Sequence, residues 1–266
     1  MNSPEDLPNA ISDPDLRGQA EAENKNFEFT TRTLGDTAEL VQDFQDLYKT
    51  LAGSVLIPDG GAVTERAKVA IISLHLLMKS RANLLIGCLT LLRGYQGNSL
   101  LFLRGAIEAC AIAALLKAKP GRADLWLNAG GSEEAYRQYR KKFRELFPKG
   151  DALLQELYGR YDWCSRVIHG SPYSLAGHCS YPDSETEDIL HFKLFDLPGD
   201  HTIVSSLYFT LDAHKRVLTK FADVLADNIR ANERVWQLHF NSVEAKLEVH
   251  RERWKSVVPS PRKVEL

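Results

Sequence analysis

The sequence predicts an all-α protein, a bundle of about six to eight helices with a small irregular or short β insert near residues 172–200. Three observations lead to this prediction. Apolar residues recur at the 3.6-residue helical period over most of the chain, and typical helix-starting and helix-ending residues flank these segments. Between residues 34 and 256 the insert is the least helical part, and its residues 189–197 are compatible with a short strand or hairpin.

The expected domain organisation is one helical domain over residues 34–256. Residues 1–33 are expected to be a disordered lead-in, because the segment is acidic and has three prolines among its first fourteen residues. Residues 257–266, with prolines at 259 and 261, are expected to be a flexible tail.

The expected helices follow from their end signals. The first begins near Asp36 and ends at Gly53, and the second runs from about Thr64 to Arg93. A third opens at residues 97–99 and stops before Pro120. The connection between the second and third is short, so we expect them to be antiparallel neighbours.

Two apolar segments, residues 69–92 and 100–118, have the length of membrane spans. The second carries Arg104 and Glu108 near its middle, and a central arginine alone costs roughly 2.5–3.5 kcal/mol in a bilayer. We therefore expect two buried helices of a soluble bundle and no membrane contact. Four widely spaced cysteines without a C-x-x-C pair favour a reducing, cytoplasmic location.

The C-terminal helical region, from about residue 201 to 255, ends in an apolar stripe. Its members recur every three or four residues, which favours a homodimer through the C-terminal helix: Trp236, Phe240, Val243, Leu247, His250 and Trp254. The alternative is that the stripe packs on the chain's own core.

Motifs for nucleotide, zinc and serine-nucleophile sites are absent from the sequence, so no cofactor is predicted. No metal site is predicted either, because a ferritin-like di-iron centre needs Glu-x-x-His on two helices and no such motif occurs. Arg234 and His239 match the Arg–His spacing of HEPN-type ribonucleases, a match that composition alone would produce.

A basic, aromatic-rich helix over residues 136–144 is the best argument for nucleic-acid binding, since cations meet phosphates and rings stack on bases. The formal net charge of −2 argues against a nucleic-acid binder driven by global charge and leaves local basic patches open. The aromatic residues also keep the core period, so the alternative is an ordinary amphipathic helix with its cations lying over apolar surface.

A polar layer inside the predicted core is the candidate site. Arg104 and Glu108 stand four apart on the most apolar helix, and Tyr161, Ser165 and His169 stand at i, i+4 and i+8 on a later one. If the two helices pack together, five polar groups share one buried layer. In a structural network Arg104 would pair with Glu108, and Tyr161, Ser165 and His169 would complete the hydrogen bonds. In a functional site Arg104, Tyr161 and Ser165 would instead bind a ligand.

This Arg-x-x-x-Glu helix followed by Tyr-x-x-x-Ser-x-x-x-His resembles bacterial all-helical families known only as domains of unknown function. The resemblance covers about residues 69–171 and implies the fold and the layer, but no activity. Two hypotheses for function stay open. The first is a cytoplasmic interaction or regulatory module in a stress or defence locus. The second is a hydrolase or HEPN-like ribonuclease in which His169 and Glu108, or His239, act as catalytic residues.

Overall fold

The fold is an all-α bundle, as predicted. The computed structural model describes residues 16–57, 64–168, 179–180, 191–192, 201–229 and 233–257. These residues form nine α-helices, seven of which have 17 residues or more. The helices are α1 (Leu16–Leu34), α2 (Asp36–Gly53), α3 (Glu65–Leu92), α4 (Gln96–Ala118), α5 (Ala123–Leu127), α6 (Glu133–Lys142), α7 (Ala152–Ile168), α9 (His201–Leu225) and α10 (Glu233–Val257).

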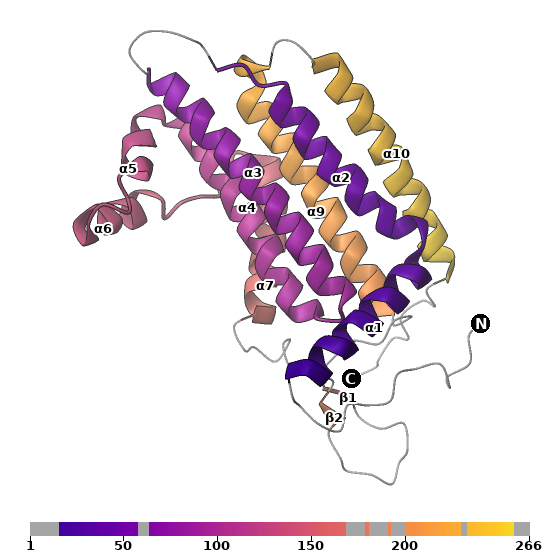
Figure 1. Cartoon of the computed structure of the whole chain (residues 1–266). Coiled ribbons are helices and arrows are strands. Elements are labelled where there is room, and N and C mark those ends of the chain that lie inside the picture. The colour runs from indigo at the N-terminus through magenta and orange to yellow at the C-terminus, as the bar shows by residue number, and fades with distance from the viewer. Residues whose placement is uncertain are drawn as a thin grey trace.

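The centre of the bundle is the antiparallel pair α3 and α4, which the short connection at Gly94 predicts. α9 packs on both of them, α7 packs on α4, and α2 lies between α3 and α10 (Figure 1). Gly87 permits the close approach of α3 and α4, because a Cβ at this position would lie 3.2 Å from Cβ of Phe102. One continuous apolar core therefore joins the long helices from α2 to α10.

Side-chain caps begin three of the helices, and one of them is at Thr64, where the second helix was expected to start. Oγ1 of Thr64 accepts a hydrogen bond from the backbone N–H of Ala67 at 3.1 Å, at the start of α3. Ser132 does the same at the start of α6 and Asp151 at the start of α7, with distances of 3.1 and 3.0 Å. These local hydrogen bonds explain why the boundaries could be predicted from the sequence.

The disorder expected for residues 1–33 is wrong for residues 16–33, which belong to helix α1. Long-range hydrogen bonds hold this helix on the bundle. The Asn26 side chain donates to the carbonyl oxygen of Arg93 at 2.6 Å, and the Tyr95 hydroxyl donates to Glu23 at 2.7 Å. Because this segment is polar, its sequence did not predict a helix. The residues that hold the helix in place lie some seventy positions further along the chain. Residues 1–15 lie outside the described part of the chain.

The C-terminal stripe packs on the chain's own core, so the expectation that it pairs two copies loses its basis. Four members of the stripe are buried against the bundle, where α10 packs mainly on α2: Trp236, Phe240, Val243 and Leu247. His250 lies 3.2 Å (Nδ1) from Oγ1 of Thr37 on α2. Intramolecular contacts thus account for five members of the stripe, and the side chain of the sixth, Trp254, lies outside the described part of the chain.

The predicted insert contains two short antiparallel strands, β1 (Cys179–Ser180) and β2 (His191–Phe192), with Cys179 opposite Phe192. The rest of residues 169–200 lies outside the described part. Two helices, α3 and α4, are long and apolar enough to cross a membrane by length and composition. Both are packed into the bundle, with 44% of the most apolar stretch of α3 and 67% of that of α4 buried.

Candidate functional site

A short arm, α5 and α6, projects from the side of the bundle before the chain returns to α7 (Figure 1). The two ends of the arm are joined, because the guanidinium of Arg122, directly before α5, donates a hydrogen bond to the carbonyl oxygen of Lys142 at the end of α6. Between α6 and the bundle lies a cavity of about 630 Å³, here called the α6 groove. A cavity of this size accommodates a small ligand or a few residues of a polymer.

Aromatic rings form one side of the groove. The rings of Tyr136 and Tyr139 are stacked, with centroids 6.2 Å apart and an interplanar angle of 25°, and Tyr139 lies 4.5 Å from Phe143. Phe143 is buried, whereas Tyr136 is half exposed. The amphipathic interpretation of this helix therefore fits only its inner end, since the outer ring is open to a ligand.

Cations surround these rings. Arg137 forms ion pairs with Glu133 and Glu134, but Arg140, Lys141, Lys142 and Arg144 form no ion pair with any residue that the structure describes. Arg140, Lys141 and Arg144 line the groove together with Arg137. The C-terminal end of α6 is thus a local excess of positive charge on a chain whose net charge is −2.

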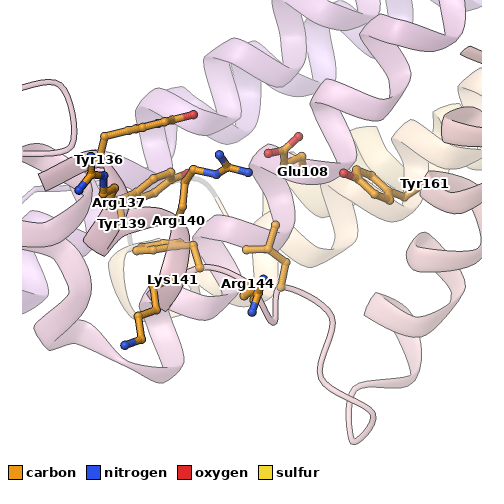
Figure 2. A pocket seen from close by; sticks show the side chains of 10 residues that line it. Glu108, Tyr136, Arg137, Tyr139, Arg140, Lys141, Arg144 and Tyr161 are labelled. Carbon is orange, nitrogen blue, oxygen red and sulfur yellow. The ribbon is translucent and has the colours of Figure 1, made fainter. Parts of the chain in front are cut away.

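Glu108 lies on α4 at the opposite side of the groove. Its side chain is half-buried and has no hydrogen-bond or ion-pair partner within the described ranges. Figure 2 shows the Arg140 guanidinium pointing toward Glu108 from one side and the Tyr161 hydroxyl pointing toward it from the other. Burial, and to a smaller extent the charge of Glu108, raises the pKa of the Tyr139 phenol.

The expected ion pair between Arg104 and Glu108 is absent from the described structure. Instead, Nη2 of Arg104 donates a hydrogen bond to the Tyr161 hydroxyl at 3.0 Å, and the guanidinium lies over the same ring at 4.9 Å from its centroid. The two residues share a helix, but the phenol oxygen of Tyr161 on α7 lies within hydrogen-bond distance of the guanidinium, and no ion pair joins the guanidinium to the Glu108 carboxylate. The Glu108 carboxylate therefore lines the groove without an ion pair to Arg104.

The remaining predicted site residues divide into two cases. α4 packs on α7, as the hypothesis of a shared layer requires. Oγ of Ser165 donates to the carbonyl oxygen of Tyr161 at 2.8 Å, so this hydroxyl is used within its own helix. His169 lies outside the described residues. Arg104, Glu108, Tyr161 and Ser165 are half-buried, so they do not form a closed core network, and two of them, Glu108 and Tyr161, line the α6 groove.

The other candidate residues do not belong to the groove. Nδ1 of His239 lies 3.4 Å from Oγ1 of Thr50 on α2, and Arg234 is exposed at the start of α10.

Burial raises the pKa of the Cys88 and Cys164 thiols to about 12, which makes these thiols poor nucleophiles. Within the described ranges no group of three or more His, Cys, Asp or Glu residues could hold a metal ion.

The sequence identified Glu108, Tyr161 and the basic helix separately, but it did not place them in one cavity. Helical periodicity indicates which residues share a face of one helix, but it does not indicate where an arm will fold.

Comparison of the chain with protein-family models, with curated proteins and with solved structures gave no match.

Proposed function

We propose that the chain is a cytoplasmic interaction module that binds single-stranded nucleic acid in the α6 groove. One observation supports the proposal: the same cavity is lined by an open tyrosine stack and by Arg140, Lys141, Arg144 and Glu108, none of which has an ion-pair partner among the described residues. Such a module would have a regulatory role, which it would exert by binding a single strand. This role is compatible with a stress or defence locus.

Each group in the groove matches one part of a nucleotide. Arg140 and Arg144 are placed to contact phosphates, which accept charge-assisted hydrogen bonds from guanidinium groups. The exposed ring of Tyr136 offers a face for a base, and such stacking is worth roughly 1–3 kcal/mol per base. Glu108 can accept hydrogen bonds only, so it suits the amino and imino N–H groups of a base edge.

A single strand fits this arrangement better than a duplex. Stacking on Tyr136 and a hydrogen bond to Glu108 both need a base whose face and Watson–Crick edge are free. Because the net charge of the chain is negative, attraction depends on the local cations of α6. Binding should therefore weaken steeply as salt is added.

The alternative proposal, a hydrolase or HEPN-like ribonuclease, has less support. His239 packs against Thr50 between α10 and α2, and neither it nor Arg234 lines the α6 groove. His169 lies outside the described residues. A binding function needs no catalytic group and uses the residues that the groove presents.

The test is fluorescence anisotropy with a labelled single-stranded oligonucleotide of mixed sequence, measured at low salt. The double variant Arg140→Ser/Arg144→Ser should bind roughly ten-fold more weakly, because it removes two phosphate contacts. The matched control is Arg66→Ser/Lys246→Ser, which removes the same charge from exposed positions outside the groove. Equal affinities of the two double variants, or no binding by the wild type, would contradict the proposal.

A further inference from the structure

The Glu108 carboxylate stands between two hydrogen-bond donors that point toward it without reaching it. Figure 2 shows the Arg140 guanidinium on one side of the carboxylate and the Tyr161 hydroxyl on the other. All three residues line the α6 groove, yet within the described part of the chain no ion pair or hydrogen bond joins Glu108 to either donor. The arrangement suits a ligand that carries both donors and acceptors along one edge.

The Tyr161 hydroxyl is placed to donate to such a ligand. Its oxygen accepts a hydrogen bond from Nη2 of Arg104 at 3.0 Å, so its own hydrogen is directed elsewhere, and no described residue accepts it. A hydroxyl that receives a hydrogen bond from a cation is polarised and becomes a stronger donor. The guanidinium over the ring and the packing of Phe147 against the ring hold the phenol in this orientation.

The order of donors and acceptors differs between the common bases. Guanine alone has two neighbouring N–H donors on its Watson–Crick edge, N1–H and the N2 amino group, and they match the two oxygens of a carboxylate. Its O6, next to N1–H, accepts from a hydroxyl. Adenine and cytosine place a ring-nitrogen acceptor beside their amino group, and uracil places its one N–H between two carbonyl oxygens. These three bases would bring lone pairs against Glu108, which disfavours their binding.

We infer that the α6 groove selects guanine, with Glu108 accepting hydrogen bonds from N1–H and the N2 amino group and the Tyr161 hydroxyl donating to O6. The inference rests on the proposed function, because it names the base that a bound single strand places in the groove. Glu108 and Tyr161 thus determine specificity, whereas the cations of α6 supply attraction to any strand.

One base can use the ring stack and the polar edge together. Tyr136 is 50% exposed and stacked on Tyr139, so it offers a ring face to the base. After burial, the charge of Glu108 is the next cause that raises the pKa of the Tyr139 phenol, so the carboxylate lies near this stack. A base on Tyr136 therefore has its edge within reach of Glu108, and Arg140 and Arg144 remain for the phosphates.

The experiment is fluorescence anisotropy at low salt with labelled uridine strands that differ at one central position, which is G, A, C or U. A single guanine in each strand prevents guanine quartets. We expect the wild type to bind the G strand about ten-fold more tightly than the other three, because a bidentate contact to a base discriminates to this order. A strand with inosine, which keeps N1–H and O6 but lacks the amino group, should bind roughly five-fold more weakly than the G strand.

Glu108→Gln should reduce the preference for G to about two-fold or less, because an amide has one acceptor and brings an N–H group against the donors of guanine. Its affinity for the all-U strand should not fall. Tyr161→Phe should lose part of the preference, since only the contact to O6 is removed. The matched control Glu233→Gln removes the same charge at an exposed position outside the groove and should keep the full preference.

The outcomes separate the inference from the proposed function. Equal wild-type affinities for the four strands, a preference for another base, or a preference for G that Glu108→Gln retains would overturn the guanine inference and leave strand binding intact. The inosine strand tests the same contact without altering the protein, so a variant that folds poorly does not decide the result. No binding of any strand would overturn both. Displacement of the labelled G strand by guanosine monophosphate as readily as by the unlabelled strand would overturn the strand as the source of the guanine.

Discussion

Arg104 on α4 holds Tyr161 on α7 at two points, through a 3.0 Å hydrogen bond from Nη2 to the phenol oxygen and through the guanidinium above the ring. The ring also packs against Phe147, with centroids 5.3 Å apart. These contacts fix the phenol at the edge of the α6 groove, where it points toward Glu108 (Figure 2). The structural link between the two helices is therefore also what shapes the site.

Tyr161→Phe should cost about 1 kcal/mol of unfolding free energy, because the charge-assisted hydrogen bond is lost while the ring stays in place. Tyr161→Leu should cost about 1 kcal/mol more, since it also removes the cation–π contact. Urea denaturation measures both, with Tyr158→Phe at a half-exposed ring as the control. If Tyr161→Phe were no less stable than Tyr158→Phe, the hydrogen bond would not matter to the packing of α7.

Glu108→Gln should change the unfolding free energy by less than about 1 kcal/mol, because the half-buried carboxylate has no partner among the described residues. The paired arrangement expected from the sequence would instead give a loss of roughly 3–5 kcal/mol for Glu108→Ala. Chemical denaturation of both variants distinguishes the two arrangements. A loss above about 2 kcal/mol for Glu108→Gln would mean that the carboxylate is structural.

His214 should make the fold sensitive to acid. Its Nδ1 lies 2.7 Å from the Tyr48 hydroxyl inside the core, and burial lowers the pKa of the imidazole to about 3. In the unfolded chain the histidine pKa is near 6.5, so below this pH the imidazole binds a proton in the unfolded state and stays neutral in the folded state. The contribution is therefore complete above pH 6.5 and is lost as the pH falls toward 3, by up to about 1.4 kcal/mol per pH unit.

The matching measurement is the unfolding free energy in urea at several pH values between 7.5 and 4. His214→Gln should lose part of the wild-type slope below pH 6.5, whereas the exposed His75→Gln should keep it. The comparison between variants matters, because carboxylates also contribute to acid unfolding. Parallel curves for the wild type and His214→Gln would contradict the assignment of a neutral buried imidazole.

The parts of the fold that the sequence predicted are those that local chemistry determines. The capping residues Thr64, Ser132 and Asp151 start their helices through hydrogen bonds to residues three positions away, so the pattern is visible in the sequence. Helix α1 was missed because Asn26 and Glu23 find their partners far along the chain. The stripe of α10 was visible, but nothing in its spacing distinguishes its own core from another copy.

The same limit applies to the site. The sequence identified Glu108 and Tyr161 and left open whether their helices pack together; in the structure α4 does pack on α7. From their spacing the sequence predicted an ion pair between Arg104 and Glu108. In the structure Arg104 instead donates a hydrogen bond to Tyr161 on another helix. The sequence could not show that Arg140 and Arg144 share a cavity with Glu108, since this depends on how the α5–α6 arm folds back.

The most direct test of nucleic-acid binding is to locate the bound strand by photocrosslinking. A single-stranded oligonucleotide carrying 4-thiouridine, irradiated with the wild-type chain and digested for mass spectrometry, should crosslink to Tyr136 or to its neighbours on α6. The double variant Arg140→Ser/Arg144→Ser should lose most of this product. Crosslinks that map only outside the α6 groove, or that persist unchanged in the double variant, would contradict the account.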